Sequence, residues 1–375
     1  MRILVAPDKF RGTLTARQAA EACATGWRRG RPGDDLDLVP MADGGEGTMD
    51  ALVEALSGRI EHATVSGPLG DPVDAAFGLA PTADGVLGVV EMARASGLAV
   101  LGVTRRDPLR ASTRGTGELM AAAIDAGAGR LVVCIGGSAT NDGGTGMASA
   151  LGARFLDDAG SAIAEGGAAL GSLARIDLSS LHAGLALTSV TGACDVYNPL
   201  TGPSGASEVY GPQKGASRDD VVVLDRALGH LAAVVARDLG VGLRDEPGAG
   251  AAGGLGFGLM AFCGANLRPG VQVVMDAVGL ADRIAAADLV ITGEGSLDEQ
   301  SLHGKVPAGV LEACELAGVP AAIVCGRATI DPGVPVVSLV ARVGAHAALA
   351  DARAALIDAA QDMAGRVGEL IGAPR

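Results

Sequence analysis

The chain has 375 residues, of which 49% are hydrophobic, so it is long enough for one large domain or about two domains with buried cores. Its 43 acidic and 29 basic residues give a formal net charge of −14, and only 2% of its residues are aromatic. A strongly negative chain with few rings for base stacking is a poor partner for nucleic acid or for an anionic membrane surface, so we exclude both.

Cysteine and histidine are scattered along the chain. The six cysteines form no Cys-x-x-Cys pair and the five histidines no His-x-x-x-His pair, which argues against a zinc site. The first residues carry charges too early for the apolar core of a signal peptide, and glycines interrupt the uncharged stretch 248–267. We therefore expect a reduced, cytoplasmic protein without a membrane span.

Strands and helices are predicted to alternate at the start of the chain. Arg2–Ala6 is a short apolar run that predicts a buried strand, and Thr15 with Gln18 forms a capping-box pattern ahead of a helix over 16–29. A second strand is predicted over 36–39 and a second helix over 48–56. This alternation is typical of a parallel sheet with helical crossovers.

The middle of the chain follows another pattern. From about 60 to 92, short β runs are broken by Gly and Pro, which indicates antiparallel hairpins. A helix over 117–126, strands over 131–135 and 186–190, and a helix over 219–238 are predicted next.

The last hundred residues return to alternation. Strands are predicted over 287–292, 321–325 and 334–340, with a helix over 306–317 and a long closing helix over 350–370. We therefore predict an α/β protein with a discontinuous parallel domain, 1–62 and 282–375, and an inserted mixed α/β domain, 63–281.

Five segments that combine glycine with polar or charged residues each follow a predicted strand: 5–12, 41–48, 136–146, 192–200 and 292–305. In open α/β sheets, ligands bind outside the carboxyl ends of the strands, so these segments are predicted to form the binding site. Two of them, at Gly44-Gly45-x-Gly47 and Gly143-Gly144-x-Gly146, lead directly into helices. Backbone N–H groups at such turns bind phosphate.

A further glycine-rich stretch, 248–258, formally contains the dinucleotide pattern Gly-x-Gly-x-x-Gly at Gly248, Gly250 and Gly253. The residues before it make a poor strand, and the nearest acidic residue for a ribose, Asp276, lies 28 positions after Gly248. An NAD-dependent dehydrogenase of a small hydroxy acid is therefore a weaker alternative. The phosphate-binding P-loop pattern is absent.

Lysine is rare in this chain. Only Lys9, Lys214 and Lys305 occur, each in a glycine-containing segment, against 26 arginines. Arginine replaces lysine readily on a solvated surface but poorly where a compact ammonium touches phosphate or carboxylate. The three lysines are therefore predicted to bind an anionic substrate.

Carboxylates in the same segments could supply the rest of phosphoryl-transfer chemistry, which needs Mg²⁺ ligands and a proton acceptor. The candidates are Asp8, Asp43, Glu46, Asp142, Asp195, Glu294 and Asp298. Some of these carboxylates could have a structural role, since Asp43, Glu46 and Asp142 could cap helices. Asp195 resembles a cap least and is the strongest single candidate. His303, the only histidine in a motif, is interpreted as a non-catalytic residue.

Eight motifs, in order along the chain, together resemble the bacterial glycerate kinase family, of the type related to the kinases of glucarate and glyoxylate catabolism. They are APDKFRGTLTA, PMADGGEGT, RGTGEL, GGSATNDGGTGM, CDVYNPL, GPQKGA, GAGAAGGLGFG and ITGEGSLDEQSLHGKVP. The resemblance covers most of the chain, from the first strand to beyond Lys305. Arg11 and Tyr197 depart from the family's usual residues, which puts acceptor preference in question.

The resemblance implies ATP- and Mg²⁺-dependent phosphorylation of D-glycerate, to 2-phosphoglycerate or 3-phosphoglycerate. It also implies two unlike α/β domains with the active site in the cleft between them. The discontinuous domain is predicted to hold a parallel, flavodoxin-like sheet with helices on both faces, and the insertion a mixed sheet. A non-catalytic organic-acid-binding protein is a further alternative, and the oligomeric state stays open between a monomer and a homodimer.

The physical reading of the residues assigns roles within this scheme. Asp43 or Asp8 accepts the hydroxyl proton, and Asp195 and Glu294 hold Mg²⁺. Lys9 and Asp195 are also counted as catalytic. The nucleotide is predicted to be bound by a larger set, namely Gly136, Gly137, Ser138, Asn141, Asp142, Lys214, Gly253, Gly254, Glu294 and Lys305.

Overall fold

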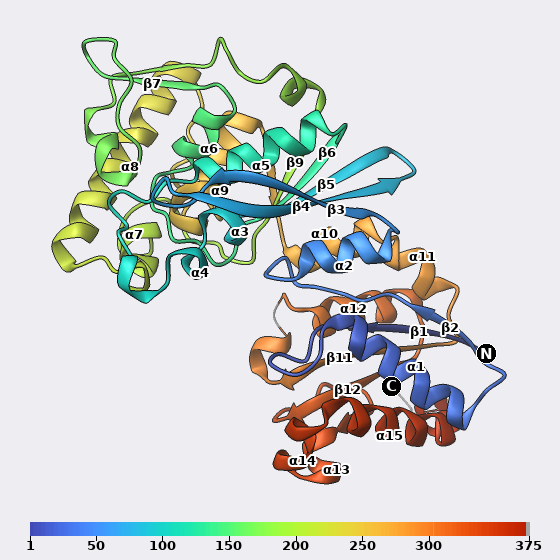
Figure 1. Ribbon diagram of the computed structural model, residues 1–375. Helices are drawn as coiled ribbons and strands as arrows, with labels where there is room; N and C mark the ends of the chain where they lie inside the picture. The colour runs from blue at the N-terminus through green and yellow to red at the C-terminus, as the bar shows by residue number, and fades with distance from the viewer. Residues whose placement is uncertain (303, 373–375) are drawn as a thin grey trace. The chain divides into compact units, whose positions relative to one another are not determined.

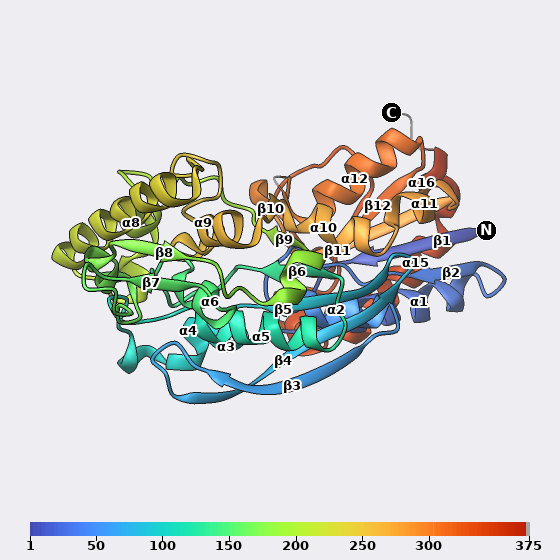
Figure 2. The same cartoon turned by 90° about the horizontal axis from the view of Figure 1, so that it is seen from above.

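The computed structural model of the chain describes residues 1–302 and 304–372, and His303 lies outside the described residues. The chain forms two compact units. Unit 1 comprises Met1–Asp43 and Val271–Arg375, and unit 2 comprises Gly44–Gly270. Each unit contains its own sheet, which Figures 1 and 2 show from two directions.

Unit 1 is built on a five-stranded sheet in which all neighbouring strands are parallel, in the order β13-β12-β11-β1-β2. Its strands are β1 (Arg2–Pro7), β2 (Asp35–Leu38), β11 (Leu289–Leu297), β12 (Ala321–Ala328) and β13 (Val336–Ser338). Taken in chain order this arrangement is 2-1-3-4-5, the flavodoxin-like order, so the predicted sheet is confirmed.

Helices cover both faces of this sheet. Alternate residues of the central strands, such as Ile3 and Val5 of β1, share a core with α1 (Ala16–Gly30) and α15 (Ala352–Gly365). Gly26 lets α1 approach α15 closely, since a Cβ there would lie 2.0 Å from the Ile357 carbonyl oxygen. The other face packs on α12 (Val306–Ala317), which contacts β1, β11 and β12.

The remaining helices of unit 1 are short. They are α10 (Gly270–Ala277), α11 (Leu280–Ala285), the 3₁₀ helix Glu299–Leu302, α13 (Leu339–Val343), α14 (Ala345–Ala350) and α16 (Val367–Gly372). Two predicted elements differ from the structure in this region. The strand predicted over 334–340 is shorter and ends at Ser338, whose side chain caps α13. The closing helix predicted over 350–370 begins at Ala352, after its cap Asp351, and is interrupted at Arg366, between α15 and α16.

Unit 2 contains a six-stranded sheet in the order β10-β9-β6-β5-β4-β3. The strands are β3 (Arg59–Ser66), β4 (Pro72–Thr82), β5 (Gly85–Glu91), β6 (Arg130–Cys134), β9 (Ser189–Ala193) and β10 (Asn266–Arg268). β3, β4 and β5 form the predicted antiparallel hairpins, and β5, β6, β9 and β10 pair in parallel. The predicted mixed sheet is thus confirmed, and Figure 2 shows the long β3–β4 pair.

The helices of unit 2 pack on this sheet and around a second core formed with the small β7 (Arg154–Leu156) and β8 (Arg175–Asp177) pair. The longest are α5 (Arg114–Asp125), α8 (Arg218–Leu239) and α9 (Ala251–Cys263). The shorter ones are α2 (Thr48–Ala55), α3 (Ala93–Ser96), α4 (Leu98–Leu101), α6 (Thr145–Ala150) and α7 (Ala206–Tyr210), with 3₁₀ turns at Val103–Arg105, Gly167–Ser172, Ala183–Leu187 and Pro212–Lys214. The strand predicted over 186–190 begins later, at Ser189, because Ala183–Leu187 forms a 3₁₀ helix.

The boundaries of the units lie earlier than the predicted domain limits of 62 and 282. Residues 44–62 group with unit 2, since α2 packs on β4 at Gly78, where a Cβ would lie 2.5 Å from Val53. Residues 271–281 group with unit 1, where Val271 packs against Gly309 of α12. None of the helices in the described part of the chain combines the length and the apolar character that a membrane span requires.

Candidate active site

In unit 1, three carboxylates gather where adjacent parallel strands end. Asp8 is the first residue after β1, Glu294 lies in β11 and Asp43 follows β2. Their negative charges interact, because Asp43 and Glu294 both raise the pKa of Asp8. Glu294 was expected in a loop after a strand ending at 292, but β11 continues to Leu297 and holds it rigidly in the ladder opposite Cys325.

Asp8 is the most strongly perturbed of these acids. Its side chain is only 5% exposed, and burial, followed by the negative charge of Asp43, raises its pKa to about 7. The Lys9 backbone N–H donates to Asp8 Oδ1 at 2.7 Å, which opposes the shift and orients the carboxylate. A carboxylate with a pKa near neutrality is suited to accept a proton during catalysis at physiological pH.

Glu294 is also buried, with 6% of its surface exposed. Burial raises its pKa, and the Ser301 hydroxyl opposes this shift. Its Oε1 atom has no hydrogen-bond partner among the described residues. Burying a carboxylate oxygen that accepts no hydrogen bond costs free energy, unless a cation binds to it. Within residues 1–302 and 304–372, no three or more His, Cys, Asp or Glu side chains lie together so as to hold a metal. Mg²⁺ needs fewer, since it is usually held by one or two carboxylates, substrate phosphates and water.

Two of the three lysines lie in the same unit. Lys9 follows Asp8 directly, and Lys305, the N-cap residue of α12, is close enough to Glu294 to lower its pKa. The first turn of α12 has no side-chain cap and contains Pro307. Its amides and the Lys305 ammonium therefore combine two features that favour an anion.

In unit 2, both glycine turns that were predicted to bind phosphate are already filled by carboxylates of the protein. Glu91, at the end of β5, accepts hydrogen bonds from the Gly47 and Met49 N–H groups at the start of α2, both at 2.9 Å. Asp142 accepts from the Gly144 and Gly146 N–H groups at the start of α6, both at 3.2 Å. These N–H groups therefore already have acceptors within the protein, and phosphate binding at the two turns stays a prediction.

Glu91 is a buried carboxylate that the sequence analysis did not select. Its Oε2 atom accepts a hydrogen bond from Arg94 Nε, while Arg94 also pairs with the exposed Asp50. The carboxylate thus ties the end of β5 to a turn more than 40 positions earlier. Only the three-dimensional fold brings these groups together.

We expect Glu91→Gln to loosen this turn. The glutamine side chain has one oxygen acceptor and one NH₂ group. The NH₂ group would face either the Gly47 and Met49 N–H groups or the Arg94 guanidinium, all of which are donors. We expect this mismatch to cost about 2 kcal/mol of local stability. Hydrogen exchange of the α2 amides, measured by mass spectrometry, should accelerate by roughly 30-fold. Asp50→Asn, which removes the exposed partner of the same arginine, is the control and should change exchange less than about fivefold. Equal effects of the two substitutions would refute the capping role of Glu91.

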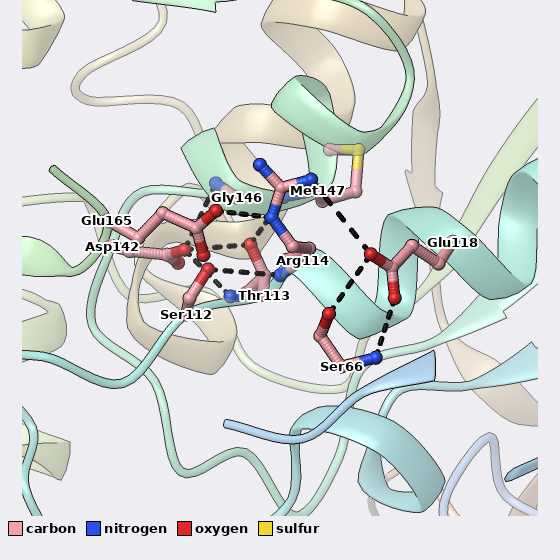
Figure 3. A network of polar contacts seen from close by, with 9 residues as sticks. All are labelled: Ser66, Ser112, Thr113, Arg114, Glu118, Asp142, Gly146, Met147 and Glu165. Atoms are coloured by element: carbon pink, nitrogen blue, oxygen red, sulfur yellow. Dashed lines mark hydrogen bonds and ion pairs between the residues drawn. The ribbon is translucent and has the colours of Figure 1, made fainter. Parts of the chain in front are cut away.

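Asp142 is the centre of the polar network in Figure 3. Its Oδ2 atom accepts from the backbone N–H and the hydroxyl of Thr113, at 2.8 and 2.9 Å, and the Thr113 hydroxyl accepts from Met147 N–H. Burial raises the pKa of Asp142, and these donors oppose the shift. On the outer side of the network, Arg114 pairs with Glu165. Asp142 therefore joins α5 to α6 inside the fold.

Lys214, Asn141, Gly253 and Gly254 surround the same buried loop. Lys214 Nζ donates to the Thr140 carbonyl oxygen at 2.7 Å, and Asn141 Nδ2 donates to Ser207 Oγ at 2.9 Å. Gly253 and Gly254 adopt positive φ angles of 70° and 88° in a kink of α9. Asp142, Asn141 and Lys214 are fully or almost fully buried, and each forms hydrogen bonds within unit 2. The contact of their side chains with the nucleotide stays a prediction.

The carboxyl ends of the parallel strands of unit 2 carry the exposed part of the predicted set. Gly136 and Gly137 are exposed just after β6, while Ser138 is buried. Asp195 is exposed after β9, and its Oδ1 accepts a hydrogen bond from Gly270 N–H at 2.8 Å, at the first residue of α10. Asp195 therefore also bonds to the start of α10, a contact that the sequence analysis did not predict.

The structure thus groups the predicted residues in two sets. Asp8, Lys9, Asp43, Glu294 and Lys305 lie at one edge of the unit 1 sheet, and the candidate Asp298 belongs to the same unit. The other predicted site residues among those described belong to unit 2. A flavodoxin-like parallel sheet with a perturbed carboxylate, further acids and lysines at its carboxyl edge is an arrangement suited to a phosphotransferase that uses a nucleotide.

Comparison with known proteins gives the family. Residues 3–370 match the glycerate kinase family, and the chain belongs to it. It is 51% identical over 331 residues to the glycerate kinase of Bacillus subtilis (strain 168), covering 88% of this chain and 86% of that protein. It is 47% identical over 334 residues to the glycerate 2-kinase of Escherichia coli (strain K12), covering 89% and 87%.

A solved structure shares the fold. The crystal structure of a protein assigned as glycerate kinase 2 of Salmonella typhimurium LT2 has a TM-score of 0.92 and 46% sequence identity, and the match covers 98% of each chain. The resemblance inferred from the eight motifs is thereby confirmed, and so is the assignment to a family of phosphotransferases.

Proposed function

We propose that this protein transfers the γ-phosphoryl group of ATP to a hydroxyl group of D-glycerate, giving 2-phosphoglycerate and ADP. The observation that carries the proposal is the buried Asp8, with a pKa of about 7, beside Asp43 and Glu294 at the carboxyl edge of the unit 1 sheet. The names of the relatives from Bacillus subtilis and Escherichia coli support the substrate, and the second of these names supports the position phosphorylated.

In this mechanism Asp8 acts as the general base. The glycerate hydroxyl gives its proton to the Asp8 carboxylate while its oxygen forms a bond to the γ-phosphorus. The bond between that phosphorus and the oxygen bridging to the β-phosphorus breaks, and ADP leaves with the electron pair. The neighbouring charge of Asp43 raises the proton affinity of Asp8, so Asp43 assists the base.

Cationic groups offset the charge of the substrates. Lys9, Lys305 and the uncapped first turn of α12 are proposed to bind phosphate oxygens, and the exposed backbone of Gly136 and Gly137 is proposed as a second binding segment. Local cations are needed here because the protein as a whole carries a net charge of −14.

Mg²⁺ fits the residues present, and Glu294 is the proposed ligand. Its Oε1 atom is buried and lacks a donor among the described residues, and a cation there would also relieve repulsion with Asp8 and Asp43. When bound, Mg²⁺ would neutralise charge that develops on the phosphate oxygens. Asp195, exposed in unit 2, stays a proposed second carboxylate for metal or substrate.

The alternative functions are separated by specific observations. A nicotinamide-dependent dehydrogenase would need a strand ahead of Gly248, but residues 240–247 contain none. A non-catalytic binding protein would be stabilised by glycerate without turning over ATP. Because the six cysteines are free, we propose a cytoplasmic location, and we propose a monomer or a homodimer as the assembly.

Incubation of the protein with ATP, Mg²⁺ and D-glycerate tests the function, with phosphorus NMR of the products. We expect ADP and a phosphomonoester whose coupling pattern identifies attachment at carbon 2, and no consumption of ATP when glycerate is omitted. A thermal shift with D-glycerate but no phosphomonoester would instead support the binding protein, and attachment at carbon 3 would correct the product.

A further inference from the structure

Among the described residues of unit 2, Lys214 is the one basic side chain that is buried. It ends the short 3₁₀ helix Pro212–Lys214, is 1% exposed, and donates from Nζ to the Thr140 carbonyl oxygen at 2.7 Å. Burial lowers its pKa to about 7, and the nearby Asp142 carboxylate opposes the shift. An ammonium group placed in this way cannot contact a phosphate at the surface unless the loop moves.

The carbonyl that Lys214 binds lies in a segment with little room for change. A Cβ on Gly253 would lie 2.0 Å from the Thr140 oxygen, and Gly143 N–H donates to the Gly253 carbonyl at 3.0 Å. The kink of α9 and the Lys214 ammonium thus enclose Thr140 from two elements distant in sequence. The same segment begins at the exposed Gly136 and Gly137, directly after β6.

Stability does not explain why a lysine stands here. Burial of a charge is expensive, and even a well-paired buried ionic group often adds no more net stability than apolar residues of similar size would. What the ammonium supplies is a directed hydrogen bond to one backbone oxygen, which fixes the conformation of the segment. That requirement is expected where the segment itself must hold a ligand.

We infer that Lys214 is a positioning residue: it fixes the segment 136–142 through the Thr140 carbonyl, so that the exposed Gly136–Gly137 backbone is preorganised for phosphate, and it does not touch the nucleotide. The inference rests on the proposed function, because it assumes that this segment binds ATP. It replaces the direct phosphate contact predicted from the sequence.

Amine labelling distinguishes the two roles in the unmodified protein. The chain has only three lysines, so acetylation by a water-soluble active ester, followed by peptide mass spectrometry, reports on each one. Lys9 and Lys305, both half-buried, should be acetylated in the native protein and protected by Mg²⁺-ATP. Lys214 should stay unlabelled with or without ATP and react only in denaturant. Rapid labelling of Lys214 in the native protein, with protection by ATP, would overturn the inference.

Lys214→Met tests the consequence for binding, because it keeps the length of the side chain and removes the donor. We expect the Kd for ATP, measured by calorimetry without glycerate, to rise at least tenfold, and the KM for D-glycerate to change less than twofold. Thermal stability should fall only modestly, since the Thr140 carbonyl loses its donor while the cost of burying the ammonium is removed. Arg218→Met, which removes an exposed cation at the start of α8, is the matched control and should leave both constants unchanged.

The outcomes separate the two claims. If the wild-type protein binds no ATP, the proposed function fails. If it binds ATP and Lys214→Met binds it equally well, only the positioning role fails. The labelling experiment uses the wild-type chain, so it still decides whether Lys214 touches ATP if the variant does not fold.

Discussion

Asp8→Asn should lower kcat by about 10²- to 10⁴-fold, the range typical for loss of a general base. Asparagine keeps the size of the side chain and can still accept the Lys9 N–H hydrogen bond, but it cannot take up the hydroxyl proton. Initial rates with saturating ATP, Mg²⁺ and D-glycerate measure the effect. Asp35→Asn, on the exposed side of β2 in the same unit, is the matched control and should retain wild-type activity.

The pH dependence tests the same assignment. Because the pKa of Asp8 is raised to about 7, the base is protonated below that pH, and kcat/KM of the wild-type protein should fall as the pH is lowered through 7. The residual activity of Asp8→Asn should lack this limb. A wild-type profile that stays flat down to pH 5 would remove Asp8 from the role of base.

Stability should change in the opposite direction to activity. The folded-state pKa of Asp8 lies above its ordinary value of 3.8, so the folded protein binds this proton more tightly than the unfolded chain does. The stability that Asp8 contributes is present below pH 4 and is lost as the pH rises through 7. At pH 8, Asp8→Asn should therefore raise Tm by about 3 °C or more, and the gain should shrink towards pH 4. Differential scanning calorimetry at both pH values measures it.

Glu294→Gln should lower kcat/KM by about 10²- to 10³-fold, because a neutral amide attracts Mg²⁺ far less than the buried carboxylate. The Mg²⁺ concentration that gives half-maximal activity should rise about tenfold or more, as one charged ligand is lost. Binding of Mn²⁺ in the presence of ATP, followed by electron paramagnetic resonance, gives a readout that does not depend on turnover.

The control for this variant is Glu299→Gln, an exposed carboxylate five positions further along the same segment. It should leave the Mg²⁺ dependence and Mn²⁺ binding unchanged. If Glu294→Gln lowers activity but binds Mn²⁺ as the wild type does, Glu294 acts on charge or structure at the edge of the sheet and is not a metal ligand.

Much of the fold was predictable because it depends on local patterns. Apolar runs such as 2–6, buried on both faces, mark the strands of a parallel sheet, and the Thr15 capping box marks the start of α1. The failures were also local in origin. Ser338 and Asp351 each cap a helix, and the cap sets the element boundary although the neighbouring apolar residues favour a longer element. Such boundaries are difficult to predict from the sequence.

The candidate site was predictable in part. Asp8, Asp43 and Glu294 were selected because they follow parallel strands, and adjacent strands place their carboxyl ends at the same edge. The roles of Asp142, Asp195 and Lys214 were not predictable in the same way. The role of each residue depends on a hydrogen-bond partner that is distant in sequence, or on complete burial. The local sequence around the residue reveals neither the partner nor the burial.

By itself, the sequence determined the parallel and mixed sheets, the glycine-rich segments at strand ends and the membership of a kinase family, because strand periodicity and ordered motifs are properties of consecutive residues. The packing of distant segments, in contrast, sets which charged groups are exposed at strand ends and which are buried within the fold. Glu91 and Asp142 fill the glycine turns that resembled phosphate sites, and Lys214 is buried behind another. Burial and long-range hydrogen bonds set the pKa and accessibility of a charge, and both arise only when distant segments pack together.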